Sequence, residues 1–176
     1  GFVLGFFYSG WPIQFKYRAL GEVAIFLAFG PLMAIGSYFV LTGVFDPRVL
    51  YISLPIGFLV VAIVQANNLR DIADDAAAGI TTVSNALGQS FAAAEYYALV
   101  VGAYVSVIVM IALGILPIWT LVVALSIPPA AKVIKLIRSA GGKRTAELRF
   151  IDQMSAQVHL LFGLLLMIGL TLGKVL

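Results

Sequence analysis

Residues 49–66 read VLYISLPIGFLVVAIVQA and contain no Asp, Glu, Lys, Arg or His. A helix that crosses the roughly 30 Å hydrocarbon core of a bilayer needs about 20 predominantly apolar residues, and this stretch is close to that length. Backbone polar groups must be satisfied inside lipid, and the stretch lacks the alternation of a barrel strand. It therefore predicts a transmembrane helix.

Four more stretches of the same kind occur along the chain. Together with residues 49–66, we predict spans at residues 20–42, 91–113, 116–137 and 154–172. Only 11% of the residues are charged, against about 25% in a typical soluble domain. The predicted fold class is an all-α, polytopic transmembrane helical bundle, with residues 1–176 forming a single membrane domain. Because the apolar residues begin at Gly1, we also expect further spans N-terminal to it.

The composition excludes several kinds of site. The chain has no cysteine and one histidine, so it has no disulfide framework, no thiolate zinc site and no site that needs two histidines. The net charge is +3. Since the basic residues border apolar spans, we attribute this charge to membrane orientation and expect no nucleic-acid partner.

The basic residues are unequally divided between the two ends of the predicted spans. Nine fall at one end: Lys16, Arg18, Arg70, Lys132, Lys135, Arg138, Lys143, Arg144 and Arg149. Two fall at the other: Arg48 and Lys174. Lys and Arg are enriched in cytoplasmic loops, so the richer end is predicted to face the cytoplasm. We expect an integral protein of a bacterial or archaeal cell membrane, with its active site on that face.

One polar motif follows directly on residues 49–66. It reads QANNLRDIADD from Gln65 to Asp75, and places Asn67, Asp71 and Asp75 four residues apart. On a helix this spacing gathers side chains on one face. Stacked carboxylates repel one another, and a cation relieves that repulsion. Oxygen donors without sulfur or imidazole suit Mg²⁺, which typically takes one or two carboxylates plus substrate phosphates. The motif therefore indicates a metal-bridged diphosphate site, against the alternative of a solvated helix end.

The motif and the residues after it resemble the second Asp-rich motif of the UbiA prenyltransferase family. In that family an N-x-x-x-D-x-x-x-D run is followed by a Gly, a Thr and a Leu-Gly pair, which match Asn67, Asp71, Asp75, Gly79, Thr82, Leu87 and Gly88. The paired Asn67-Asn68 and the segments 8–12, 20–22, 29–43 and 157–166 are most similar to the branch that prenylates 1,4-dihydroxy-2-naphthoate in menaquinone synthesis.

The resemblance implies a nine-helix bundle with a cavity open to lipid, of which these spans would be the last five. It implies transfer of a polyprenyl group from a polyprenyl diphosphate to an aromatic acceptor, with Mg²⁺ as cofactor and membrane lipid as surroundings. Asp71 and Asp75 would be the catalytic metal ligands, with Asp74 a further metal candidate. Substrate contacts would come from Asn67, Asn68, Arg70, Tyr8, Lys143 and Arg144.

Two departures from the family pattern are visible. The first Asp-rich motif of the family, between its second and third helices, is not in this chain, so we expect this chain alone to be inactive. Basic residues that the family often carries in the loop are replaced by Ala76, Ile80 and Thr81, which leaves Arg70 as the basic residue of the motif.

Other interpretations stay open at this point. The acceptor could be 4-hydroxybenzoate, homogentisate or a lipid alcohol. The acids could form the ion site of a transporter subunit, or the chain could be a non-catalytic remnant. We interpret His159 as a hydrogen-bonded packing residue, Asp152 and Gln153 as caps of the last span, and Gly169 and Gly173 as a close helix contact.

Overall fold

The computed structural model describes residues 5–7, 10–12, 20–141 and 146–175, and in these ranges it contains helices and turns but no strand. Five helical segments are long and apolar enough to cross a membrane: Gly21–Thr42, Arg48–Ala77, Gln89–Ala112, Ile118–Ala140 and Leu148–Val175. The predicted fold class and the five spans are confirmed.

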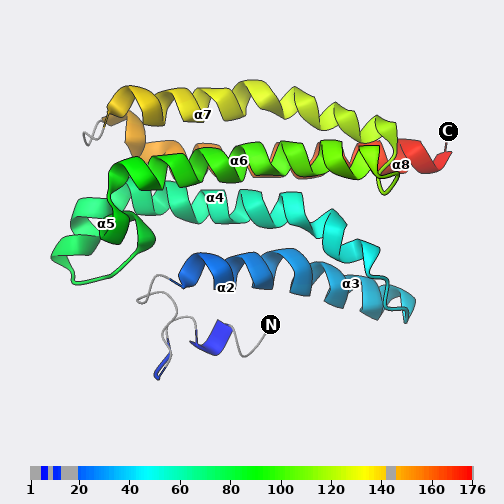
Figure 1. Ribbon diagram of the computed structural model, residues 1–176, viewed down its shortest axis with the longest axis horizontal. Coiled ribbons are helices and arrows are strands. Elements are labelled where there is room, and N and C mark those ends of the chain that lie inside the picture. The colour runs from blue at the N-terminus through cyan, green and yellow to red at the C-terminus, as the bar shows by residue number, and fades with distance from the viewer. Residues whose placement is uncertain (1–4, 8–9, 13–19, 142–145, 176) are drawn as a thin grey trace.

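Consecutive spans run in opposite directions, so that their ends gather at two opposite ends of the bundle (Figure 1). The first span comprises α2 (Gly21–Leu27), the π-helical η2 (Ala28–Leu32) and α3 (Met33–Thr42), and the second is α4 (Arg48–Ala77). The short α5 (Val83–Leu87) leads to α6 (Gln89–Ala112). The fourth span joins the 3₁₀ segment η3 (Ile118–Ser126) to α7 (Ile127–Ala140), and η4 (Ala146–Phe150) precedes α8 (Ile151–Val175).

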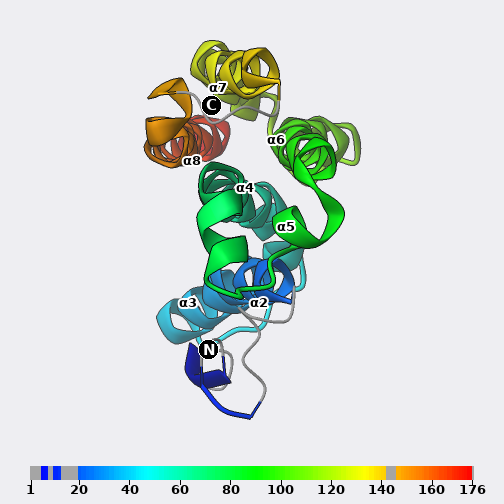
Figure 2. The same ribbon diagram turned by 90° about the vertical axis from the view of Figure 1, so that its left-hand side faces the viewer.

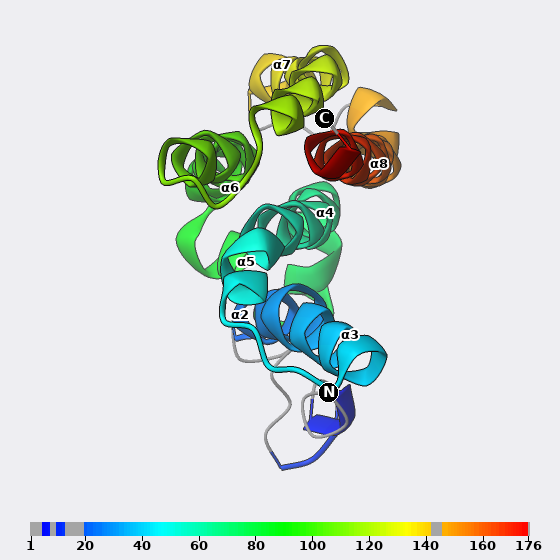
Figure 3. The same ribbon diagram turned by 90° about the vertical axis from the view of Figure 1, so that its right-hand side faces the viewer.

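Helix α4 occupies the centre of the bundle. Seen along the helices, it lies between the first span on one side and α6 and α8 on the other, with α7 beyond that pair (Figures 2 and 3). Its buried face includes Leu59, Ala62, Ala66 and Leu69, which belong to the main hydrophobic cluster. The C-terminal end of α4 lies at the same end of the bundle as α5 and the start of α8 (Figure 1).

The structure extends α4 beyond the predicted end at residue 66. At 1.5 Å per residue its 30 residues span roughly 45 Å, which exceeds the roughly 30 Å hydrocarbon core. The helix therefore carries the whole polar motif past the apolar region as regular helix. Hydropathy marks where the apolar run stops, but a helix continues as long as its backbone bonds and packing allow.

Prolines account for the irregular helical segments. Pro31 lies inside η2, where its missing N–H and its ring are accommodated by the wider π-helical turn. Pro128 and Pro129 follow Ile127 at the start of α7, where the backbone N–H groups would lack helical partners in any case.

Glycines set the closest helix contacts. A Cβ on Gly30 would lie 3.2 Å from the Cα of Gly57, which brings the first span against α4. A Cβ on Gly169 would lie 2.6 Å from the Cα of Thr120. A Cβ on Gly173 would likewise lie too close to the side chain of Pro117. The predicted close contact of Gly169 and Gly173 is therefore confirmed, as packing of the last span on the start of the fourth inside the bundle.

Two tyrosine–serine pairs join helices in the apolar interior. The Tyr96 hydroxyl lies 2.8 Å from the Ser155 hydroxyl and links α6 to α8. The Tyr104 hydroxyl lies 2.8 Å from that of Ser126 and links α6 to the fourth span. Interhelical hydrogen bonds between such side chains stabilise helix association where no water is present. The Tyr96–Ser155 pair fixes the N-terminal part of α8 beside α6.

Candidate functional site

The predicted motif lies on the last turns of α4, and its members have different surroundings. Asn67 and Asp75 both line a cavity of about 320 Å³. Asp71 instead faces Arg70, and Asp74 is exposed to solvent. The expectation that these side chains share one polar face is thus met by Asn67 and Asp75, eight residues apart on the helix.

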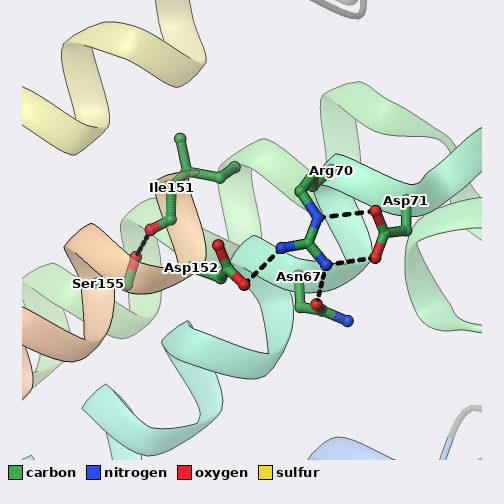
Figure 4. A network of polar contacts seen from close by, with 6 residues as sticks. All are labelled: Asn67, Arg70, Asp71, Ile151, Asp152 and Ser155. Atoms are coloured by element: carbon green, nitrogen blue, oxygen red, sulfur yellow. Dashed lines mark hydrogen bonds and ion pairs between the residues drawn. The ribbon is translucent and has the colours of Figure 1, made fainter. Parts of the chain in front are cut away.

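Arg70 is the centre of a network of four hydrogen bonds (Figure 4). Its Nε and Nη2 donate to the two carboxylate oxygens of Asp71 at 2.8 and 2.6 Å. Nη2 also donates to Oδ1 of Asn67 at 2.5 Å, and Nη1 donates to Oδ2 of Asp152 at 2.5 Å. The planar guanidinium group of Arg70 has enough donors, in a fixed arrangement, to contact all these oxygens at the same time. The ammonium group of a lysine in its place could not contact all of them together.

Asp152 has a different role from the predicted cap. It lies in the first turn of α8, and its partner Arg70 is 82 positions away in the sequence. Its Oδ1 is buried without a hydrogen-bond partner among the described residues. Gln153 is exposed. The cap prediction relied on local sequence, whereas the ion pair depends on α4 and α8 lying side by side.

The cavity at this end of the bundle is formed by four elements. Its walls come from the start of α2, one face of α4, the residue before α5 and the start of α8: Gly21, Glu22, Ile63, Val64, Asn67, Asn68, Asp75, Thr82 and Asp152. Three carboxylates, two amides and one hydroxyl therefore face it beside two aliphatic side chains. Such a mixture suits a ligand with a polar, charged part and an apolar part.

Glu22 is a residue of this cavity that sequence reasoning did not assign to the site. Its side chain is buried, with only 8% of the residue exposed. Its Oε1 accepts a hydrogen bond of 2.9 Å from Nδ2 of Asn68. The signal in the sequence was an acidic residue at the start of an apolar span, a position where ionisable groups are usually functional.

The rim of the cavity at Thr82 is held by local and long-range hydrogen bonds. Thr82 and Asn85 form a reciprocal capping box at the start of α5. Ser84 donates to Oε1 of the buried Gln65 at 3.2 Å, and Gln65 Nε2 donates to Oε2 of Glu95 at 2.8 Å. These bonds attach α5 to α4 and α6, and so fix Thr82 beside the motif.

A second cavity, of about 520 Å³, lies farther along the same helices and is almost entirely apolar. On α4 its walls include Val49, Ile52 and Ile56, and the polar cavity continues with Ile63 and Asn67. Steps of three or four residues keep these side chains on one helical face. The two cavities therefore follow one another along α4.

The first span and α8 also line the polar cavity at one end and the apolar cavity farther along. Glu22 in the polar cavity is followed seven residues later by Phe29 in the apolar one, and Asp152 is followed by His159. Seven residues are about two helical turns, or roughly 10 Å. The buried Nε2 of His159 has no hydrogen-bond partner within the described part of the chain. We predicted that His159 would be hydrogen-bonded within the bundle. For Nε2 this prediction was wrong, because the cavity that His159 lines is almost entirely apolar.

The residues of the polar cavity fit a magnesium ion by the chemistry of their donors. Carboxylate and amide oxygens are ligands that Mg²⁺ accepts, and one or two carboxylates suffice when substrate phosphates supply the rest. Asp75 and Asn67 would hold the ion from α4, and Asp152 from α8. In the described ranges no group of three or more His, Cys, Asp or Glu side chains is close enough to form a metal cage by itself.

The structure brings some of the predicted site residues together and leaves others apart. Asn67, Asn68 and Asp75 line one cavity, and Arg70 and Asp71 adjoin it through the Arg70 network. Asp74 lies on the exposed side of the helix. Tyr8, Lys143 and Arg144 lie outside the residues that the structure describes, as do Lys16 and Arg18.

Comparison with known proteins shows which proteins this chain is similar to. The chain is 30% identical over 173 residues to a 1,4-dihydroxy-2-naphthoate octaprenyltransferase of Bacillus subtilis, in a match that covers 98% of this chain and 55% of that protein. It is 30% identical to the UbiA prenyltransferase domain-containing protein 1 of Dictyostelium discoideum, over 98% of this chain and 50% of that protein. It is 31% identical to the human protein of that name, in a match that covers 96% of this chain and 47% of that protein.

The chain therefore spans about half the length of the curated relatives that it matches. No solved structure matches it. The model of the UbiA prenyltransferase family matches residues 1–154, which include the motif, the polar cavity and most of the spans. The chain belongs to the UbiA prenyltransferase family.

Proposed function

We propose that the protein to which this chain belongs transfers a polyprenyl group from its diphosphate to an aromatic acceptor, and that the acceptor is 1,4-dihydroxy-2-naphthoate. The observation that carries the proposal is the succession of two cavities along one face of α4, polar at the motif and apolar beyond it. A polyprenyl diphosphate has the same succession of a charged head and an apolar tail.

The apolar cavity suits the part of the prenyl chain next to the diphosphate. Phe29, Met33, Ile56 and Leu160 are among its walls, and it lies in the apolar part of the spans. The hydrocarbon chain loses no hydrogen bonds there, and the walls exclude water. Water exclusion protects an allylic cation from hydrolysis once the C–O bond to the diphosphate breaks.

The polar cavity suits the diphosphate together with its metal ion. Mg²⁺ held by Asp75, Asn67 and Asp152 would neutralise the charge of the leaving diphosphate. Arg70 already contacts Asn67 and Asp152, and would contribute a fixed positive charge next to the phosphates. We propose that Asp71 acts on the site through Arg70, and that Lys143, Arg144 and Tyr8 contribute further substrate contacts.

The choice of acceptor rests on the relatives. One relative is named for transfer to 1,4-dihydroxy-2-naphthoate, whereas several others are UbiA prenyltransferase domain-containing proteins whose names give no acceptor. We propose a role in menaquinone synthesis on this basis, in a bacterial or archaeal cell membrane with the motif end facing the cytoplasm. The distribution of basic residues supports that orientation.

The test is a prenyl-transfer assay with the full-length protein in membranes, with Mg²⁺, a polyprenyl diphosphate and each candidate acceptor in turn. Asp75→Asn and Asp71→Asn should each lower turnover by about 100-fold or more, because charge stabilisation at the leaving group is lost. Asp46→Asn, in the turn at the opposite end, is the control and should keep full turnover. Removing Mg²⁺ with EDTA should abolish transfer, and adding it back should restore it. Unchanged turnover of Asp75→Asn would contradict the proposal.

A further inference from the structure

The pair formed by Glu22 and Asn68 is the least expected feature of the polar cavity. Glu22 comes from the start of the first span and Asn68 from α4, and the 2.9 Å bond between them crosses from one helix to the other. Both residues are buried, at 8% exposure each, and both line the cavity. A buried carboxylate is costly unless it is paired or has a function.

Their position separates them from the metal ligands proposed above. Asn67 and Asn68 are adjacent, and therefore point about 100° apart around the helix. Asn67 faces Arg70, whereas Asn68 faces Glu22. The cavity thus has one wall that is engaged with Arg70 and another that presents a carboxylate and an amide.

The surroundings of the second wall favour a flat, mostly apolar ligand with a hydroxyl group. Val64 lies one helical turn before Asn68 on α4 and lines the cavity with it, as Ile63 lies one turn before Asn67. The volume of about 320 Å³ is at the lower limit of the roughly 300–1,000 Å³ that is typical of small-molecule pockets. Beside the diphosphate and its metal ion, such a space takes one small aromatic ring system at the second wall, and not a polyprenyl chain as well.

We propose that Glu22 and Asn68 form the binding site for a hydroxyl group of the aromatic acceptor, and that the Glu22 carboxylate takes the proton of that hydroxyl during transfer. This inference rests on the proposed function. Oε1 of Glu22 is held by Asn68, a group that does not itself titrate, and the Glu22 side chain lines the polar cavity. Glu22 would act as a general base for the ring.

Protons and electrons balance in this step without a further reactant. The hydroxyl proton moves to Glu22 while the ring carbon bonds to the allylic carbon and the allylic C–O bond breaks. The electron pair of that bond leaves with the diphosphate. The substituted ring carbon then releases its proton, or carbon dioxide from a carboxylate, which restores the aromatic ring. Glu22 returns the hydroxyl proton to the oxygen.

The first experiment compares binding of two probes to the full-length protein without any diphosphate. The probes are 1,4-dihydroxy-2-naphthoate and its analogue with the hydroxyls methylated, measured by equilibrium dialysis in detergent. Wild type should bind the dihydroxy probe about 10- to 100-fold more tightly, as expected for a hydrogen bond to a charged group. Glu22→Gln should lose most of that preference, because an amide is a weaker acceptor than a carboxylate, and Glu22→Asp should restore part of it.

Asp46→Asn is the control. Asp46 is a carboxylate in the turn between α3 and α4, at the end of the bundle opposite the polar cavity, and it does not line that cavity. This variant should keep the full preference for the dihydroxy probe. Equal losses in Glu22→Gln and Asp46→Asn would overturn the proposal, as would a Glu22→Gln protein that folds and keeps the preference.

Steady-state kinetics separate this proposal from the proposed function. Glu22→Gln should raise KM for the acceptor and lower kcat, and leave KM for the polyprenyl diphosphate unchanged. A change in KM for the diphosphate alone would overturn the acceptor site while leaving prenyl transfer intact. If wild type transfers no prenyl group to any acceptor, the proposed function fails, and the dialysis result still decides whether Glu22 binds the hydroxyl.

Discussion

At the scale of single residues, the site depends on side chains that share hydrogen bonds across helices. Arg70 binds three acidic or amide partners, and one of them, Asp152, belongs to a distant helix. The side chains of Arg70 and Asp152 are 26% and 21% exposed. Water screens the pair only in part, so the pair should contribute measurably to stability.

We expect a double-mutant cycle of Arg70→Ala and Asp152→Ala to give a coupling free energy of about 0.5–3 kcal/mol, as is usual for residues in one ion-pair network. The measurement is equilibrium unfolding in detergent micelles. The control pair is Asp46 and Arg48, an ion pair at the other end of the bundle in which the Arg48 side chain is 74% exposed. Pairs with an exposed partner contribute less, so this second cycle should show a smaller coupling than the first. Additive effects of Arg70→Ala and Asp152→Ala would contradict the network.

Sequence reasoning could find only part of this site. The four-residue spacing of Asn67, Asp71 and Asp75 is local and is visible in the sequence. The partners Asp152 and Glu22 are 82 and 46 positions away from the residues they contact. No spacing rule connects such positions, because their contact exists only once the spans have packed. The two hydrogen bonds that Arg70 donates to Asp71 could not be predicted either, because they depend on side-chain conformation.

At the scale of elements, the predicted spans were correct because the bilayer demands long apolar helices. The apolar span was predicted to end at residue 66 with the motif after it on a helix, and α4 indeed continues through the motif to Ala77. The 3₁₀ and π-helical types of two segments were not predicted. Helical type depends on how the chain fits its neighbours. Gly169 shows this, since its lack of a side chain matters only where α8 crosses the backbone of η3.

We predict that Gly169→Ala lowers the free energy of unfolding by about 1–3 kcal/mol, the usual cost of overpacking a tight contact. The added Cβ would lie 2.6 Å from the Cα of Thr120 and 2.8 Å from the carbonyl oxygen of Trp119, and neither backbone atom can move aside easily. Gly36→Ala in α3 is the control, since a Cβ added there would meet no atom within 4 Å. It should leave stability unchanged or raise it. Equal effects would contradict this contact.

The short helix α5 should be the least stable element beside the cavity. It has five residues and depends on the Thr82–Asn85 capping box. We expect Thr82→Ala to weaken it by about 0.5–2 kcal/mol and to speed hydrogen exchange of the amides of residues 84–88 about 2- to 30-fold, in proportion to that free energy. Thr171→Ala removes an exposed hydroxyl on α8 and is the control. Unchanged exchange in α5 would show that Ser84 and Gln65 hold this helix without the cap.

At the scale of the whole molecule, the division of charge between the two ends predicts the orientation in the membrane. Arg70, Arg138 and Arg149 belong to the elements at the motif end, whereas Arg48 and Lys174 lie at the opposite end (Figure 1). The enrichment of Lys and Arg on the cytoplasmic side would place α5 inside the cell and the turn between α3 and α4 outside. The proposed polyprenyl diphosphate would then enter the polar cavity from the cytoplasmic side.

The orientation can be measured with single cysteines introduced into this chain, which has none of its own, in a full-length protein whose other cysteines are replaced. Val44 lies in the turn after α3 and Ala78 follows the end of α4, and both are exposed. With a membrane-impermeant maleimide, Val44→Cys should react in intact cells, whereas Ala78→Cys should react only after the membrane is made permeable. The two sites are at opposite ends of α4, so each serves as the control for the other. The reverse pattern would put the motif outside the cell, where a cytoplasmic diphosphate has no access, and would therefore also count against the proposed function. The expected pattern would place the motif, the polar cavity and Glu22 at the cytoplasmic end of the bundle, as the proposed function requires.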